Sequence, residues 1–339
     1  MSIEKIWDVL LLTEGQYVTR LPDAAYDMPA WYVDQIFEED QLITAALERL
    51  GLRVGRADWS DASVDWRQTQ AALFRATWDY FHRFDAFKSW LARASEQTLL
   101  INPAAIIAWN FDKFYLRDLI AAGVAVAPTL FLERSFTSKN SPSTNDNPRS
   151  LAELFESTGW GEAVIKPAVS GGARETYRVT PDAAGPLEAH FSKLLSQERM
   201  LFQKFLPAIS GDAPGQGEVS IMAMGGHVTH AIRKVAAPGD FRVQDDHGGR
   251  VLPHEASAEE TAFAHQVIQA CQRAVPSSTP PLYHRIDMVR DPSGALTLCE
   301  LELIEPELWL RSCPAAADQL AAAIAASINP TKSMTALCF

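Results

Sequence analysis

The sequence predicts an α/β protein made of two or three lobes. At 339 residues the chain is long enough to form more than one folding unit. Over the first hundred residues, short apolar runs alternate with segments of helical periodicity, which is typical of a small open α/β domain. Near the other end, two alternating apolar segments flank a turn sequence and predict a β-hairpin. A mixed fold of helices and strands is therefore expected.

The first hundred residues predict strands that are followed by helices. The apolar run Trp7–Thr13 indicates a buried strand, and Asp34–Gly51 a helix that ends at a glycine. A further strand, Ala71–Arg75, precedes a loop and a helical pattern that begins at Phe84. Ligands of open α/β sheets bind beyond the C-terminal ends of strands. The loop after this strand therefore supplies three candidate substrate-binding residues, whose alternative role is to cap the next helix: Arg75, Thr77 and Asp79.

A second unit begins near Asn102 and carries a lysine in an unusual place. Asn110 can cap a helix from about Phe111 to Ala122, which puts Lys113 in the first turn. A cation there opposes the positive end of the helix dipole, and a bound anion would resolve the conflict. The alternative is a solvated lysine.

A glycine-rich loop follows another lysine. Lys166 lies in the predicted strand Ala163–Pro167, and small residues come shortly after it at Ser170, Gly171 and Gly172. Such a loop lets several backbone N–H groups approach a phosphate. An ordinary hairpin turn is the alternative.

The remaining elements follow from the same patterns. The polar segment 135–150 is expected to be a surface loop, and 330–339 a loose tail. Further helices and strands are expected over Leu151–Thr158, Glu175–Val179, Met200–Leu206, Glu218–Met224, His227–Lys234, Glu259–Ala274 and Ala315–Ile328.

The hairpin predicted over Tyr283–Pro306 carries an unusual set of charges. An Asp-Pro-Ser-Gly sequence between its two segments favours a type I turn. With this turn, Arg285 would lie opposite Glu300, and Asp287 opposite Leu298. Strand parity places four charged side chains on one face: Arg285, Asp287, Glu300 and Glu302.

Three carboxylates on one face of an apolar hairpin point to a cation. Buried carboxylates repel one another unless a positive charge lies between them, and oxygen ligands suit Mg²⁺ or Mn²⁺. The alternative is a solvated face on which Arg285 serves as a salt-bridge partner.

Composition excludes some functions. Hydrophobic residues make up 47% and charged residues 21% of the chain, as in ordinary globular proteins. The formal net charge of −12 argues against a nucleic-acid partner. No apolar run approaches a membrane span, and no signal peptide is recognised at the N-terminus. The four cysteines lack metal-binding spacing, so we expect a reduced, cytoplasmic protein.

The order of these features resembles the ATP-grasp superfamily across about Asn102 to Pro306. Within it, the chain is similar to the carboxylate–amine ligases that include glutathione synthetase and D-alanine–D-alanine ligase. The pieces RATWDY, INPAAIIAWNFDK, FRVQ and CELELIEP are similar to the O-ureido-serine cyclo-ligases of cycloserine biosynthesis. The resemblance implies an ATP-grasp fold that follows an open α/β domain.

The resemblance also implies a division of the chain. The N-terminal α/β substrate domain would cover 1–101. A central lobe with a glycine-rich lid would cover 102–204, and a C-terminal lobe with the metal site 205–329. The tail 330–339 would follow.

Roles for individual residues come from the same resemblance. The expected metal ligands for Mg²⁺ or Mn²⁺ are Asp287, Glu300 and Glu302. Many peptide-forming relatives carry Asn at the position of Glu302, and small residues where this chain has Leu303–Pro306, so their substrate does not transfer. The expected ATP-binding residues are Lys113, Lys166, Ser170, Gly171, Gly172, Gln203, Phe205, Leu206 and Glu218.

The chemistry that these residues permit is ATP-dependent joining of a carboxylate to an amine. An acyl phosphate supplies the leaving group that a carboxylate lacks, and cations must neutralise two anions while it forms. The candidate residues for this charge neutralisation are Arg242 and Arg285, and Lys234 is a third candidate. We expect a small amino-acid-like substrate, release of ADP and phosphate, and possible ring closure.

Two other functions stay open at this point. One is an ATP-binding regulatory module, and the other is a phosphoryl-transferring relative that forms no amide. Neither a nucleic acid nor a membrane is expected as a partner. Related ligases are often dimers, so a homodimer is a possible assembly.

Overall fold

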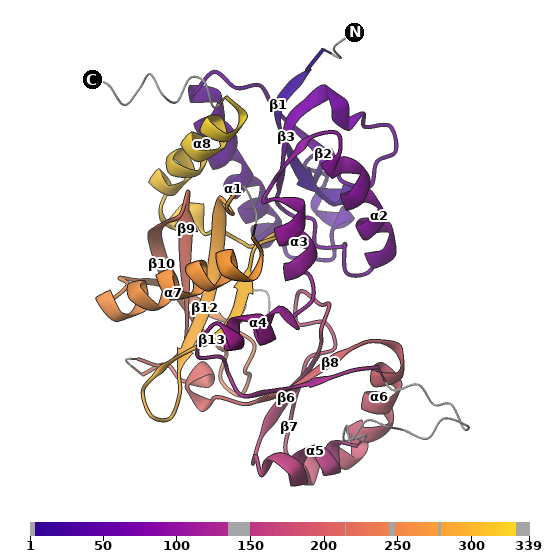
Figure 1. Cartoon of the computed structure of the whole chain (residues 1–339), viewed down its shortest axis with the longest axis vertical. Coiled ribbons are helices and arrows are strands. Elements are labelled where there is room, and N and C mark those ends of the chain that lie inside the picture. Colours follow the sequence, from indigo (N-terminus) through magenta and orange to yellow (C-terminus); the bar gives the residue numbers. More distant parts are fainter. Residues whose placement is uncertain (1–3, 135–149, 214, 244–247, 277–278, 330–339) are drawn as a thin grey trace.

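The computed structural model describes residues 4–134, 150–213, 215–243, 248–276 and 279–329, and they contain three β-sheets (Figure 1). The expected loop over 135–150, apart from Ser150, and the expected tail over 330–339 lie outside the described residues. The sheets follow one another along the long axis, with the first sheet and the second at opposite ends and the third between them. The predicted α/β class is confirmed.

The first sheet is parallel and has the order β2-β1-β3-β4. Its central strand is the predicted apolar run, whose side chains are almost all buried. The chain adds β2 on one side of β1, and β3 and β4 on the other side. The loops that follow β1 and β3 therefore lie next to each other at the C-terminal edge of the sheet. The strands and the helices that accompany them are β1 (Trp7–Thr13), β2 (Val54–Asp58), β3 (Thr69–Phe74), β4 (Leu99–Ile101), α1 (Ala30–Arg49) and α2 (Phe84–Ser95).

The second sheet is antiparallel and has the order β5-β8-β6-β7. A capping box at Ser150 begins the predicted helix α5, and the left-handed Gly159 ends it. Sequence analysis missed a long helix that packs beside it, although its apolar residues Ala184, Leu187, Phe191 and Leu194 recur at helical spacing. The elements are β5 (Thr129–Leu132), α5 (Leu151–Thr158), β6 (Ala163–Pro167), β7 (Tyr177–Val179), α6 (Ala184–Gln197) and β8 (Met200–Lys204).

The third sheet is antiparallel, with the order β11-β10-β9-β12-β13. The predicted hairpin forms its last two strands. The elements are α3 (Ala104–Asn110), α4 (Tyr115–Ala121), β9 (Glu218–Met224), β10 (His227–Val235), β11 (Arg250–His254), α7 (Ala258–Ala274), β12 (Tyr283–Arg290), β13 (Leu296–Glu302) and α8 (Ala315–Ile328).

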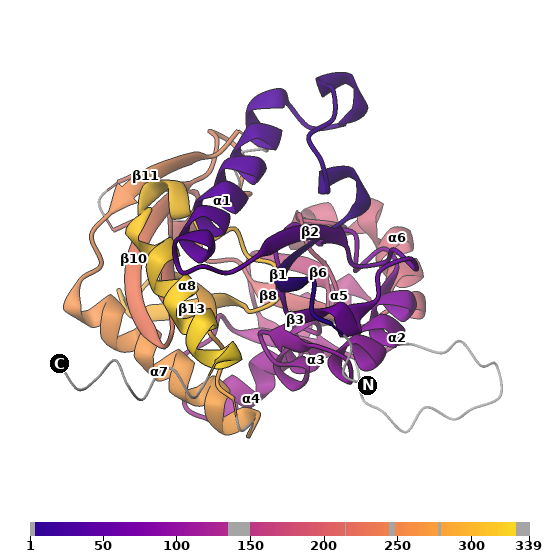
Figure 2. The same cartoon turned by 90° about the horizontal axis from the view of Figure 1, so that it is seen from above.

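The two faces of the third sheet are covered by different helices. On one face, Ile221 and Ala223 of β9 join a core with α4 and α7. On the other, Met222 and Met224 join a core with α8 and α1, which lie side by side in both views (Figures 1 and 2). The helix α1 connects β1 and β2 of the first sheet, and α8 covers the third sheet. This second core therefore joins the N-terminal unit, which contains the first sheet, to the unit that contains the third sheet. The expected domain boundaries at residues 101 and 204 fall at the ends of β4 and β8, whereas α4, expected in the central lobe, packs against the third sheet. The division into domains stays a prediction.

The expected helix Phe111–Ala122 was wrong. Two short helices, α3 and α4, replace it, and Lys113 lies in the turn between them. Asn110 ends α3 and does not cap a helix; its side-chain amide donates to Leu301 O at 2.8 Å and accepts from Leu303 N at 2.9 Å. This asparagine therefore holds α3 against the end of β13.

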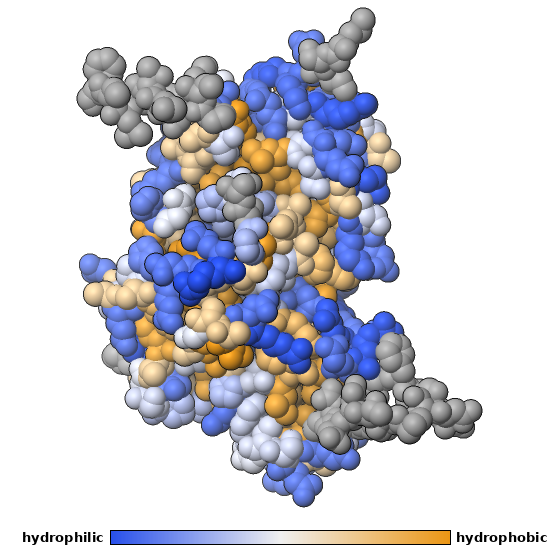
Figure 3. Space-filling view, in the orientation of Figure 1, coloured by the Kyte–Doolittle hydropathy of each residue, from blue (hydrophilic) through white to orange (hydrophobic). Residues whose placement is uncertain are grey.

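No described helix is long and apolar enough to cross a membrane. On the face drawn in Figure 3, hydrophilic and hydrophobic residues are interspersed, with hydrophilic ones prominent along the margins.

His284 is a buried group without a polar partner. It lies on β12, on the same side as Ile286 and Met288, and it is fully buried. Neither ring nitrogen has a hydrogen-bond partner among the described residues. Burial lowers the pKa of His284 to about 4. The folded protein therefore excludes a proton that the unfolded chain binds below pH 6.5.

We expect His284→Leu to make the protein less sensitive to acid. The parent should lose about 2 kcal/mol of stability relative to the variant between pH 7 and pH 5, because only the unfolded parent gains a proton at this site. Denaturant unfolding at both pH values measures the difference. Replacing the exposed His265 by Gln controls for the loss of one imidazole. A stability difference that does not change with pH would contradict the prediction.

Candidate active site

The charged face of the hairpin forms the floor of the site. Arg285 lies opposite Glu302, and Asp287 lies opposite Glu300. The predicted register was therefore wrong, although the four side chains share a face as expected. Two extra residues explain the shift: the turn spans residues 291–295, with Asp291 N donating to Ala295 O at 2.9 Å, and a bulge follows Asp287.

Buried cations neutralise these carboxylates. Arg285 Nη2 lies 3.0 Å from Asp287 Oδ2 and also pairs with Glu302. Lys234 Nζ lies 2.5 Å from Glu218 Oε1 and 3.6 Å from Asp287 Oδ1. Burial opposes ionisation of Asp287, but Arg285 and Lys234 outweigh it and lower the pKa of this carboxyl. Asp287 is thus held as a carboxylate between two cations.

Lys113 links the hairpin to the glycine-rich loop. Its Nζ lies 3.1 Å from Glu300 Oε1 and donates to Ser170 O at 2.5 Å. Burial raises the pKa of Glu300, but Lys113 and Lys166 lower it by a greater amount. The turn between α3 and α4, and not a helix N-terminus, therefore presents this lysine to the site.

A cleft of about 180 Å³ lies between the second and third sheets. Its lining combines apolar side chains, among them Val164, Phe241 and Val243, with charged ones. Sequence analysis predicted nine ATP-binding residues, and the structure brings all nine to this cleft: Lys113, Lys166, Ser170, Gly171, Gly172, Gln203, Phe205, Leu206 and Glu218. Three further candidates line it as well: Arg242, Lys234 and Arg285.

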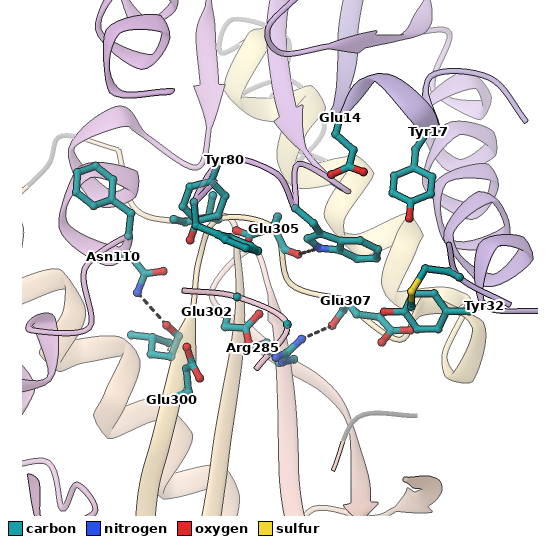
Figure 4. Close-up of a pocket in the computed structure, with 18 of the residues that line it drawn as sticks. Glu14, Tyr17, Tyr32, Tyr80, Asn110, Arg285, Glu300, Glu302, Glu305 and Glu307 are labelled. Atoms are coloured by element: carbon teal, nitrogen blue, oxygen red, sulfur yellow. Dashed lines mark hydrogen bonds and ion pairs between the residues drawn. The ribbon is translucent and has the colours of Figure 1, made fainter. Parts of the chain in front are cut away.

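A chamber of about 430 Å³ adjoins the cleft (Figure 4). The two cavities share the lysines, the arginine, the glycines and the carboxylates of the floor: Lys113, Gly171, Gly172, Lys234, Arg285, Glu300 and Glu302. The rest of the chamber is lined by aromatic and acidic side chains, among them Glu14, Tyr17, Asp27, Tyr32, Trp78, Tyr80, Phe81, Glu305, Glu307 and Trp309.

The three expected substrate residues do not line this chamber. Arg75 is buried, with Nε 2.7 Å from Asp40 Oδ1, and Thr77 is fully buried. Asp79 accepts a hydrogen bond from Trp59 Nε1 at 2.7 Å. They do not cap α2 either, which has no side-chain cap. Two other residues of the same loop, Trp78 and Tyr80, line the chamber instead.

Sequence analysis missed the acidic lining of the chamber. Glu14 directly follows β1, so the rule that suggested the loop after β3 applied equally to it. Burial raises the pKa of Glu14 to about 6, that of Glu302 to about 7 and that of Glu305 to about 8. Tyr17 and Asp27 lie outside any periodic segment, and no sequence signal marked them.

The three expected metal ligands do not form a ready-made cage. Within the described residues, no group of three or more His, Cys, Asp or Glu side chains is arranged to hold a metal ion. Glu300 pairs with Lys113, while Asp287 and Glu302 pair with Arg285. Their donors are nonetheless all oxygen atoms on one face, a set that suits a hard divalent cation.

Comparison with known proteins agrees with this architecture. Residues 9–102 match the family model of the N-terminal domain of D-cycloserine synthetase DcsG, and residues 135–274 match that of the ATP-grasp domain of prokaryotic glutathione synthetase. The cycloserine biosynthesis protein DcsG of Streptomyces lavendulae is 28% identical over 316 residues, which cover 90% of this chain and 95% of that protein.

Solved structures agree as well. A crystal structure of D-cycloserine synthetase DcsG matches with a TM-score of 0.75 and 25% identity, covering 94% of this chain and 99% of that one. D-alanyl-alanine synthetase A from Vibrio cholerae matches in fold, with a TM-score of 0.62 and 15% identity over 98% of this chain and 99% of that one.

The chain is an ATP-grasp ligase that forms carbon–nitrogen bonds. Its activity is ATP-dependent carboxylate–amine ligation. Within this class it resembles D-cycloserine synthetase DcsG over nearly its whole length, so the resemblance inferred from the sequence is confirmed.

Gly171 lies against the N-terminal unit. A Cβ built on this glycine would lie 2.6 Å from Phe81 Cε1, far inside the distance of normal contact. Phe81 belongs to the loop after β3 and lines the chamber. The glycine-rich loop therefore reaches across from the second sheet to the first.

We expect Gly171→Ala to weaken binding of ATP with Mg²⁺ about tenfold, because overpacking of this size costs on the order of 1–3 kcal/mol. Titration calorimetry measures the affinity. Adding Phe81→Leu to the variant should restore part of it by making room for the methyl group. Gly161→Ala, whose Cβ would meet nothing, is the control. Parental affinity in Gly171→Ala would refute the contact.

Proposed function

We propose that this ligase activates a small amino-acid-like carboxylate as an acyl phosphate, releases ADP and phosphate, and joins the acyl group to a nitrogen, with ring closure within one molecule included. One observation carries the proposal. The cleft and the chamber meet at a single charged floor, formed by Lys113, Lys234, Arg285 and the hairpin carboxylates.

The residues that line the cleft suit a nucleotide. Phe205 and Leu206 would offer apolar contact to a base, and the Gln203 side chain, which donates to Thr129 Oγ1 at 2.9 Å, adds a polar edge. Lys166 and the loop of Ser170, Gly171 and Gly172 would hold the phosphates. Glu218, fixed by Lys234, would reach the ribose or the substrate.

The floor fits phosphoryl transfer to a carboxylate. Two anions must approach each other, and Arg285, Lys234 and Arg242 would neutralise the charge that develops between them. A divalent cation, Mg²⁺ or Mn²⁺, would be held by Asp287, Glu300 and Glu302 and would add further neutralisation of the phosphates. Closure of the glycine-rich loop would keep water from the acyl phosphate.

The likeness to D-cycloserine synthetase DcsG supports ring closure as the reaction. Its N-terminal domain model matches residues 9–102, the part of the chain whose loops line the chamber. A chamber of about 430 Å³ suits one small molecule. A homodimer stays a prediction, and so does the division into domains.

The test is ADP release with ATP and Mg²⁺ across amino acids, dipeptides and ureido amino acids, both enantiomers of O-ureido-serine included. We expect one acid to stimulate ADP release, and mass spectrometry should show loss of water from it or its joining to an amine. A stable phosphorylated product without an amide would favour the phosphoryl-transferring alternative. No stimulation by any compound would count against the proposed substrate class.

Lys166→Ala should lower acid-stimulated ADP release on the order of 100-fold, because a charge-assisted contact to the transferring phosphates is lost. Lys88→Ala on α2, whose half-exposed side chain pairs with Asp85 and lies over the Phe84 ring, should retain parental turnover. Steady-state kinetics with a coupled ADP assay measures both. Unchanged ATP turnover in Lys166→Ala would remove this lysine from the nucleotide site.

A further inference from the structure

Five side chains fix the backbone that follows the hairpin. The carbonyl oxygens of residues 303 to 307 each accept a hydrogen bond from a side chain that lies far away in the sequence or in another element. The donors are, in order, Asn102 Nδ2 (2.9 Å), Tyr283 Oη (2.6 Å), Trp78 Nε1 (3.3 Å), Arg75 Nη1 (3.5 Å) and Arg285 Nη1 (3.5 Å). Such a run of fixed carbonyls holds the middle residue, Glu305, in one place.

The Glu305 carboxylate differs from those of Glu300 and Glu302 in its interactions. Its carboxylate lines the chamber, close to Tyr80 and to the indole that binds its own carbonyl oxygen (Figure 4). No ion pair or hydrogen bond joins this carboxylate to another described residue, whereas Glu300 and Glu302 are both paired. The charged groups that act on it are Glu302, Lys113 and Arg285.

This environment makes the ionised Glu305 carboxylate a stronger base than an ordinary glutamate. Burial raises the pKa of Glu305, and the negative Glu302 raises it further, to about 8. A general base works best when its pKa is close to the working pH. Packing does not require an acid here, because the backbone carbonyls and not the carboxylate make the structural contacts.

We propose that Glu305 is a catalytic residue that receives the proton of the attacking nitrogen, and that the chamber takes a nucleophile with an uncharged N–H group and no second carboxylate. This inference rests on the proposed ligase function. It assigns the nitrogen to the chamber side of the floor and the acyl phosphate to the cleft side.

The proposed step transfers the acyl group from phosphate to nitrogen. The lone pair of the neutral nitrogen attacks the acyl carbon, and the carbon–nitrogen bond forms. The bond between the acyl carbon and the phosphate oxygen breaks, and its electron pair leaves on inorganic phosphate. The proton on the nitrogen moves to a carboxylate oxygen of Glu305, which later returns it to water.

The lining of the chamber supports the choice of nucleophile. Its cations Lys113, Lys234 and Arg285 all lie at the floor, where the carboxylate to be activated needs them. The walls present acids, among them Glu14 and Asp27, and these would repel a second carboxylate. An aromatic set from the first unit, including Tyr17, Tyr32 and Trp78, completes the walls and suits an uncharged group.

Glu305→Gln tests the proton transfer, since it keeps the volume and removes the acceptor. With ATP, Mg²⁺ and the acid that gives turnover in the parent, we expect product formation to fall on the order of 10²–10³-fold. The KM for ATP should stay unchanged. A burst of one ADP per enzyme should persist, and hydroxylamine should trap the acyl phosphate as a hydroxamate. Glu305→Asp should recover part of the rate.

Several results would overturn the inference. One is product formation within about threefold of the parent in Glu305→Gln. Another is loss of the ADP burst together with product, which would place Glu305 in phosphoryl transfer or in folding. Glu259→Gln, an exposed acid on α7 that pairs with Arg290, is the control. Failure of the ligase function itself would show in the parent, as no acid-stimulated ADP release, and not in the variant alone.

A second experiment tests the selection against a second carboxylate. In the parent, O-ureido-serine, which carries an uncharged N–H group and one carboxylate, is compared with aspartate and glutamate. Stimulation of ADP release by a dicarboxylate as well as by compounds with one carboxylate would refute the selection against a second carboxylate.

Discussion

The charged contact at the centre of the third sheet is the constraint on which the site depends. Asp287 is buried between Arg285 and Lys234, and Ser220 donates a further hydrogen bond at 2.5 Å. Charges taken out of water must be fully paired, and loss of one partner from such a set costs about 3–5 kcal/mol. The sheet can bear this cost because the same face becomes apolar a few residues along, where Met222 and Tyr283 pack under α8.

Fixing this floor requires contacts from all parts of the chain. Asn102 and Asn110 hold backbone groups of the hairpin and of the segment after it, while Lys113 joins Glu300 to the glycine-rich loop. Arg75, which emerges from the first sheet, is held by Asp40 and reaches the Pro306 carbonyl. The first unit thus positions the floor of the candidate site and also lines the chamber.

The sequence predicted what depends on local periodicity and composition. Strand parity placed Arg285 and the carboxylates on one face, and β6, β9, α5 and α8 have the expected bounds. The register could not be predicted, because the bulge after Asp287 and the five-residue turn have no strong local signature. Arg75 was expected to contact substrate because it lies at a loop after a strand. Its ion pair with Asp40 on α1 is a tertiary contact, which no local pattern reports.

The distribution of charge in the chamber favours one orientation of the proposed substrate. Every lysine and arginine among the described lining residues lies at the floor shared with the cleft, and Glu14 and Asp27 lie on the wall formed by the first unit. An amino-acid-like molecule placed with its carboxylate toward the wall would meet two acids in a poorly solvated space, where such repulsion is strong. In the opposite orientation, the carboxylate of the molecule would meet Arg285 and Lys234. It would then point toward the cleft, where a phosphoryl donor would lie. The net acidity of the chain therefore need not oppose the binding of anions, because the floor concentrates buried cations where the proposed reaction would bring two anions together.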